Sequence, residues 1–151
     1  MPMPHTYRHA SREWRAFLDD AKDQMGLDSD NSAYTAVQGV LLCFRRRLTV
    51  AQGLAFADVL PCVLRAIFVA GWDAAAPPAP FGTRAEMTAE AKALRPRHNL
   101  TPDNAIEATA WALRRQVRGP DLERALSGLP EGASAFWTVP AGAEQPHPRI
   151  V

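Results

Sequence analysis

Apolar residues recur at helical spacing along most of the chain. In the first such stretch, from about Ala10 to Met25, the apolar positions are Trp14, Phe17, Leu18, Ala21 and Met25. Spacing of three and four residues predicts an amphipathic helix, which Gly26 ends. A second apolar stripe from Ala33 to Leu48 follows a polar cluster at 28–32 that is rich in N-cap residues. This combination predicts a second helix.

Capping signals divide the next segment into two shorter helices. Thr49 and Gln52 fit a capping box, so a third helix is predicted to start there and to reach about Val59. Pro61 suits the first turn of a fourth helix. That helix is apolar nearly all round, which implies burial on more than one side. Gly71 is placed to end it in a left-handed conformation.

The chain then repeats this pattern. The Leu-Pro pair that begins at Leu60 recurs at Leu129, 69 residues later, and the same shift matches further apolar positions without a gap, such as Phe44 with Leu113. A gapless match of this kind is typical of a duplicated helical unit. We expect both Leu-Pro pairs to form sharp corners with buried leucines. Between the copies, residues 73–82 hold three prolines and predict a stiff linker.

The second copy opens with the same kinds of signal as the first. Thr83 and Glu86 fit another capping box. Thr101, Pro102 and Asp103 place a cap, a first-turn proline and a first-turn acid ahead of the next apolar stripe. These three residues predict a helix that starts there.

The sequence therefore predicts an all-α fold, a helical bundle built from two tandem repeats of about four helices each. Repeat one spans about 10–72, the linker 73–82 and repeat two about 83–137. Together they are expected to form a single domain over 1–137. Residues 138–151 carry three prolines and show no periodicity, so we expect a largely disordered tail.

Composition and charge argue against several classes of function. The chain has 151 residues, of which 47% are apolar and 22% charged, as is typical of a soluble globular domain. A formal charge of +1 gives no strong nucleic-acid signal, and the arginine runs at 45–47 and 114–115 are explained by the dipole at helix ends. With no signal-like start and no long apolar stretch, we expect a cytoplasmic protein without membrane contact.

The sequence predicts no catalytic residues, no metal site and no cofactor. Cys43 and Cys62 lie among apolar residues of predicted helices, where free thiols behave as small hydrophobes, and neither has a histidine near it in sequence. His5 and His9 are four residues apart and could chelate a metal with His98. However, no cysteine or acidic ligand is placed with these histidines.

Arg65, together with Trp72, is the candidate for ligand binding. It is the only charged residue between Pro61 and Trp72, and a guanidinium on an apolar helix must reach solvent or find a partner. Two interpretations stay open: an ion pair that ties two helices together, or recognition of a ligand carboxylate or phosphate. The candidate partners for the ion pair are Asp19, Asp20, Asp58 and Glu107.

The segment from Leu60 to Arg65, followed by Gly71 and Trp72, resembles the most recognisable motif of the bacterial family called domain of unknown function 2267. The resemblance covers about 14–137. It implies an all-helical fold and no established activity. In the second copy Ser134 stands at the position of Arg65, and no Gly-Trp pair follows, so the two copies would not present the same site.

These observations favour a non-catalytic helical binding or interaction module, with an unknown protein partner or self-association. The alternative is a small-molecule (anion) binding protein, or an unrecognised enzyme, that uses the region of Arg65 and Trp72. A pocket lined by both residues and a second polar group would favour the alternative, whereas a flat apolar patch would favour the module.

Overall fold

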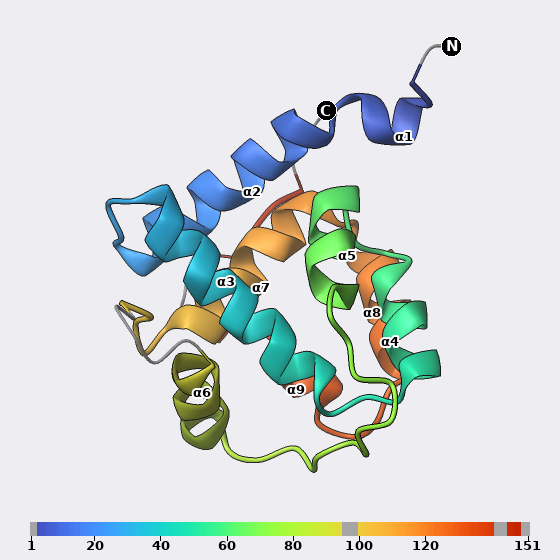
Figure 1. Cartoon of the computed structure of the whole chain (residues 1–151). Helices are drawn as coiled ribbons and strands as arrows, with labels where there is room; N and C mark the ends of the chain where they lie inside the picture. Colours follow the sequence, from blue (N-terminus) through green and yellow to red (C-terminus); the bar gives the residue numbers. More distant parts are fainter. Residues whose placement is uncertain (1–2, 95–99, 141–144, 149–151) are drawn as a thin grey trace.

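The computed structural model describes residues 3–94, 100–140 and 145–148, and within these residues the chain is helical and has no strand (Figure 1). The helices are α1 (His5–Arg8), α2 (Ala10–Met25), α3 (Asp30–Arg45), α4 (Val50–Ala57), α5 (Cys62–Val69), α6 (Arg84–Ala93), α7 (Ala105–Gln116), α8 (Gly119–Ser127) and α9 (Ala133–Phe136). The predicted all-α class is therefore confirmed.

Both predicted capping boxes are present. The Thr49 hydroxyl accepts from the Gln52 amide at 3.2 Å, and the Gln52 side chain accepts from the Thr49 amide at 2.8 Å. Thr83 and Glu86 exchange the same two bonds at the start of α6, each at 3.1 Å. These bonds satisfy amides that the first turn of a helix leaves without partners, so α4 and α6 begin where the sequence predicts.

The start of α7 differs from the prediction. The expected opening at Thr101 is a turn in which the Ala105 amide donates to the Pro102 carbonyl at 3.2 Å, and the helix begins at Ala105. Asn104 sits at the N-cap, but its side-chain amide donates to the backbone carbonyl of Gln24 at 2.9 Å instead of capping the helix. A bond to the end of α2 thus replaces the local cap.

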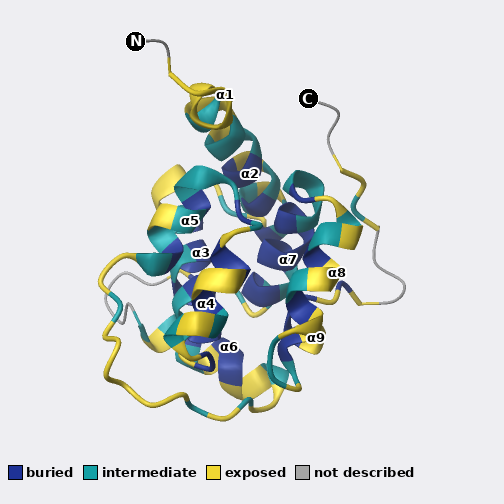
Figure 2. Cartoon of the chain, turned by 90° about the vertical axis from the view of Figure 1, so that its right-hand side faces the viewer, coloured by how far each residue is buried: buried dark blue, intermediate teal, exposed yellow. Residues whose placement is uncertain are grey.

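Helices α3 and α7 form the centre of the molecule. Helix α2 packs mainly against α7 and also against α3, while α6 packs against α3. Buried residues concentrate on the central helices, and exposed ones lie on the outer faces of α4, α6 and α8 (Figure 2). Between the central helices and the short ones, the fully buried ring of Phe44 contacts three others, with centroids 4.9 to 5.3 Å away: Phe56, Phe136 and Trp137.

The two Leu-Pro corners are not equally buried. Leu60 is only 2% exposed, as predicted, and its carbonyl side leads directly into α5. Leu129 is half-buried, so the expectation that both leucines are buried holds only for the first corner. Gly71 has a φ of 67°, the left-handed conformation predicted for the residue that ends the fourth helix.

Helix α1 projects from the bundle, whereas the linker at 73–82 contacts it, because Phe81 packs against the core and the Ala79 amide donates to the Arg46 carbonyl at 2.8 Å. Helix α1 has no buried residue and projects beyond the body from the start of α2 (Figures 1 and 2). The residues from 73 to 82 contain no helix and run around the molecule to α6.

Of the expected tail at 138–151, the structure describes 138–140 and 145–148, and Val139 is buried there. The prediction of a disordered tail stays a prediction.

Candidate functional site

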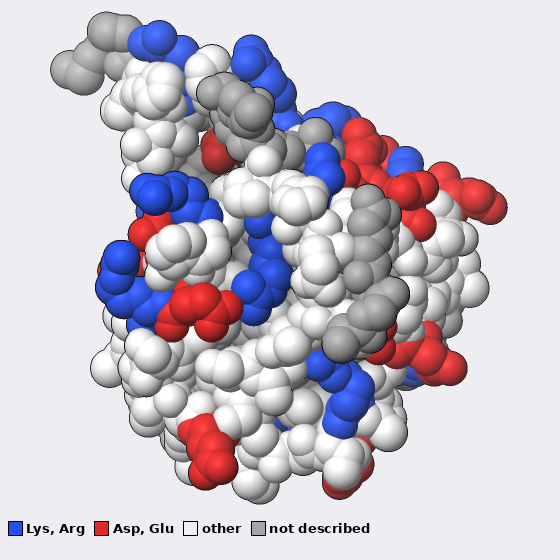
Figure 3. All heavy atoms as spheres, turned by 180° about the vertical axis from the view of Figure 1, so that it is seen from behind, with Lys and Arg blue, Asp and Glu red and all other residues white. Residues whose placement is uncertain are grey.

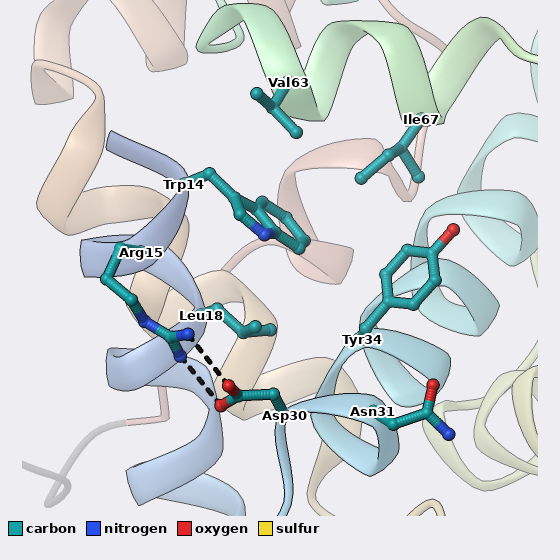
Figure 4. A pocket seen from close by; sticks show the side chains of 8 residues that line it. All are labelled: Trp14, Arg15, Leu18, Asp30, Asn31, Tyr34, Val63 and Ile67. Carbon is teal, nitrogen blue, oxygen red and sulfur yellow. Dashed lines mark hydrogen bonds and ion pairs between the residues drawn. The ribbon is translucent and has the colours of Figure 1, made fainter. Parts of the chain in front are cut away.

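An open hollow of about 510 Å³ lies between α2, α3 and α5 (Figure 4). Its walls come from all three helices and are mostly apolar: Trp14, Leu18, Tyr34, Val63 and Ile67, with Arg15, Asp30 and Asn31 on one side. Val63 and Ile67 are four residues apart on α5 and point toward the rings of Trp14 and Tyr34. A hollow of this size and lining can accept apolar side chains.

Two aromatic rings line the hollow. The rings of Trp14 and Tyr34 meet edge to face, with centroids 6.1 Å apart and an interplanar angle of 83°. Both side chains are half-buried. Each ring has an apolar body and a polar tip, the kind of side chain that is enriched where proteins bind one another.

The charged side of the hollow is internally neutralised. Arg15 donates to both carboxylate oxygens of Asp30, at 2.9 and 2.8 Å, and to Asp19 at 2.6 Å. Lys22 also donates to Asp30 at 2.8 Å. The bonds from Arg15 and then Lys22 hold the pKa of Asp30 well below its usual range. This side of the hollow therefore carries fixed ion pairs rather than a free charge.

Arg65 does not have the carboxylate partner that we expected. Its Nε donates to the carbonyl of Ala57 at 3.1 Å and its Nη2 donates to that of Leu60 at 3.3 Å. Within the described chain it makes no ion pair with the candidate acids, two of which are taken by other arginines: Asp19 by Arg15 and Asp20 by Arg115. The Ala57 carbonyl also accepts the Leu60 amide at 3.0 Å, so Arg65 adds a second donor to the turn that links α4 to α5. These carbonyl acceptors give the cation of an apolar helix partners without a carboxylate.

Trp72 lies beside a different arginine. Its ring centre is 5.3 Å from the guanidinium carbon of Arg45, and its edge fills the space that a Cβ on Gly53 would need. Trp72 and Arg45 line a cavity of about 430 Å³, and Arg65 is not among the residues that line it. The structure therefore does not bring the two candidate residues together in this cavity.

The three consecutive arginines at the end of α3 have different partners. Arg45 donates through Nη1 to the carbonyls of Phe68 and Ala70, at 3.0 and 2.9 Å. Arg46 and Arg47 both pair with Glu90 on α6, Arg46 at 2.8 Å. Burial alone lowers the pKa of Arg45. Burial is also the largest effect on Arg47, but the bond to Glu90 and the charge interactions with Cys43 and Glu90 together raise the pKa of Arg47. The helix-end interpretation of this run misses these distinct tertiary contacts.

Side chains suited to covalent or metal chemistry are not assembled in the described residues. Cys43 and Cys62 are free thiols, and burial raises the pKa of Cys43 to about 12. The rings of His5 and His9 lie edge to face, 5.6 Å apart, while His98 lies outside the described residues. No group of three or more metal-ligating side chains occurs in the chain as described. We assign no catalytic residue.

Charges of both signs are interspersed on the face opposite to that of Figure 1, with uncharged atoms between them (Figure 3). The described residues of this face form no broad basic surface of the kind that binds nucleic acid. Among the described helices, none combines the length and the apolar character that crossing a bilayer requires.

Sequence reasoning missed the residues that line the hollow. Trp14 and Leu18 fall on the apolar stripe of α2, and a stripe does not reveal whether a neighbouring helix covers it. One signal was available. The fourth helix is apolar on nearly all sides, and Val63 and Ile67 are among its residues that the fold leaves half-buried.

One family of known proteins matches this chain. The model of the family described as "Uncharacterized conserved protein (DUF2267)" matches residues 14–136. The chain therefore belongs to this family, as the motif at Leu60 to Trp72 indicated. No curated protein matches the chain. The family's description names no activity, so function has to be argued from the geometry.

Proposed function

We propose that this chain, as a member of the DUF2267 family, is a non-catalytic binding module whose protein partner docks an amphipathic helix in the hollow between α2, α3 and α5. The observation that carries the proposal is the hollow itself, which is open, mostly apolar and lined by the rings of Trp14 and Tyr34. Apolar grooves between helices commonly receive the apolar face of a partner helix.

The charges around the hollow support a partner that is recognised by shape and apolar contact. Arg15 and Lys22 are already paired with Asp19 and Asp30. A partner gains little by replacing these ion pairs, because exposed pairs contribute little free energy. Binding should therefore depend weakly on salt concentration.

A library of displayed helical peptides tests the proposal, with Ile67→Lys as the decisive variant. Lysine at 67 puts a charge into the hollow, so peptides selected on the wild-type protein should lose most of their affinity. Leu54→Lys is the matched control, because Leu54 is 52% exposed and lies outside the residues that line the hollow. Circular dichroism checks that both variants fold.

Selected peptides should carry apolar anchors spaced three and four residues apart. Peptides that bind Ile67→Lys as well as the wild type would contradict the proposal. Native mass spectrometry separates the partner from self-association. A dimer that Ile67→Lys dissociates would identify the occupant as a second copy and would overturn the proposal of a separate partner.

We also infer that the chain consists of two tandem repeats, α2 to α5 and α6 to α9, related by a pseudo-two-fold axis. Reciprocal packing supports this, since α2 packs on α7 while α6 packs on α3. Matching ion pairs support it as well. Arg46, directly after α3, pairs with Glu90 on α6, and Arg115, 69 residues after Arg46, pairs with Asp20 on α2. A crystal structure whose superposed halves put Phe44 and Leu113 in unrelated places would contradict the repeat.

The cellular setting of the module belongs to the same proposal. We place it in the bacterial cytoplasm, and two free cysteines support this, because reducing compartments keep thiols unpaired. Fractionation of cells that produce the tagged full chain tests the location. Recovery of the protein in a membrane or secreted fraction would contradict it.

A further inference from the structure

The cavity beside Trp72 contains a cation that the described protein leaves without a carboxylate. Arg45 uses Nη1 to hold the carbonyls of Phe68 and Ala70. Its Nε and Nη2 atoms donate no hydrogen bond to any described residue, and it has no ion pair among them. The Nε–Nη2 edge of a guanidinium is one of the edges on which a carboxylate forms two parallel hydrogen bonds. The two carbonyl bonds and the contact with Trp72 hold this edge in a fixed orientation.

The corresponding arginine of the second half shows how the protein neutralises such a cation. Arg114 stands 69 residues after Arg45, and its Nε donates to the carbonyl of Trp137 at 2.8 Å. Its Nη1 donates to the carboxylate of Glu123 at 3.0 Å. The residue 69 positions before Glu123 is Leu54, whose side chain has no atom that accepts a hydrogen bond. The first half thus keeps the arginine and lacks the acid.

The rest of the cavity restricts what could neutralise Arg45. Leu48, Trp72 and Pro77 provide apolar walls. Arg46 also lines the cavity, but its charge is shared with Glu90. Asp73 lines it too and accepts the Ala75 amide at 3.0 Å, so the wall of the cavity already carries one carboxylate. A ligand with one negative charge suits these surroundings better than a dianion.

We propose that Arg45 and Trp72 form a binding site for a small organic carboxylate with an apolar or aromatic body. The carboxylate binds the free edge of Arg45, and the body lies against Trp72, Leu48 and Pro77. A cavity of about 430 Å³ is in the range that holds small organic ligands. This site is separate from the hollow between α2, α3 and α5, because Arg45 and Trp72 do not line that hollow.

Isothermal titration of the full chain with 3-phenylpropionate tests the proposal. The wild type should bind this monoanion in a one-to-one ratio, should not bind the neutral 3-phenylpropanol and should bind inorganic phosphate more weakly. Arg45→Gln should lower the affinity at least about tenfold, since it removes a charge-assisted pair of hydrogen bonds. A short peptide that ends in a free phenylalanine carboxylate, compared with its amide, distinguishes a chain terminus from a free metabolite as the source of the carboxylate.

Arg65→Gln is the matched control. Arg65 also donates to two carbonyls at a helix end, but it does not line the cavity. Its loss should therefore leave 3-phenylpropionate binding unchanged. If Arg45→Gln does not fold, Arg45→Lys carries the test, because lysine keeps the charge and a donor but loses the planar fork, and binding should still weaken. The proposal is wrong if the wild type shows no saturable binding, or if the folded Arg45 variants bind as tightly as the wild type.

Discussion

Arg45 at the end of α3 and Arg114 near the end of α7 make the same tertiary contact with different electrostatic outcomes. Each donates to the carbonyl of an aromatic residue 23 positions later, Phe68 or Trp137. Arg114 adds a carboxylate, Glu123, whereas Arg45 adds a second carbonyl and the face of Trp72. The charge of Arg114 is neutralised by a carboxylate of the chain. Arg45 keeps a guanidinium edge that donates to no described residue.

The difference shows that the architecture of the two halves constrains the arginine but not its counter-charge. The carbonyl contact ties a long helix to the short helix that follows the Leu-Pro corner, so each half needs it for packing. The acid on α8 is not needed for that contact. Its counterpart on α4 can be an apolar residue such as Leu54. Stability and surface chemistry are therefore set by different residues, and four measurements on the two halves test this.

The largest difference between the halves should appear at the two Leu-Pro corners. Leu60→Ala should lower the free energy of unfolding by about 2–5 kcal/mol, because it leaves a cavity in the core. Leu129→Ala should cost clearly less, since Leu129 is half-buried and its surroundings can take up solvent. Urea denaturation measures both. Equal losses would show that the corners are energetically equivalent despite their different burial.

Acid should weaken the contact that Glu90 of α6 makes with the end of α3. Although burial raises it, the net pKa of Glu90 is lowered below its usual 4.5, because Arg47 donates to it. A lowered pKa in the folded state stabilises the protein above pH 4.5, and this contribution is lost as the pH falls below that value. Glu90→Gln should cost about 1.5–3 kcal/mol at neutral pH. The variant should also lose less stability than the wild type on acidification, and parallel pH profiles would contradict this.

A smaller effect is expected where α3 crosses α6. A Cβ on Gly39 would lie 2.6 Å from the carbonyl oxygen of Ala91, which is backbone and cannot rotate away. Gly39→Ala should therefore destabilise by about 1–3 kcal/mol, although alanine favours helix. The position 69 residues later in α7 already holds an alanine, Ala108. Gly119→Ala is the control, because a Cβ there meets nothing within 4 Å. Stabilisation by Gly39→Ala would mean that the backbone of Ala91 lies farther from Gly39 in solution than this distance.

The smallest effect should come from the acid that distinguishes the two arginines. Glu123→Gln should change the free energy of unfolding by less than about 1 kcal/mol, because the Glu123 side chain is 56% exposed and its ion pair is screened by solvent. The difference from wild type should shrink at high salt in thermal melts. A loss that is larger and independent of salt would show that Arg114 needs its carboxylate for packing.

Local features of the fold could be predicted from the sequence. Helix α2 spans Ala10–Met25 as its apolar stripe indicates, and the capping boxes at Thr49 and Thr83 place the starts of α4 and α6. Each of these features depends on residues within four positions of one another. The predicted start of α7 was wrong. Asn104, the residue before the helix, bonds to Gln24, 80 residues away, and no local pattern encodes that contact.

The candidate sites were harder to predict for the same reason. Arg65 was expected to need a carboxylate, but two carbonyls at the end of α4 satisfy it. In the sequence Arg45 cannot be told from its neighbours Arg46 and Arg47. Tertiary packing distinguishes them, because it brings Glu90 to Arg46 and Arg47 but not to Arg45. Periodicity indicates which face of a helix is apolar. It does not indicate how much of that face the other helices cover.

The buried thiol of Cys43 can report local opening between two helices. The thiol lies on α3 and donates to the Met87 carbonyl of α6 at 3.4 Å, and with its pKa raised to about 12 it is almost entirely protonated at neutral pH. An alkylating reagent reaches this thiol only when the contact between α3 and α6 opens, so the labelling rate reports the population of the opened state. Half-buried Cys62 in the same chain supplies the reference rate.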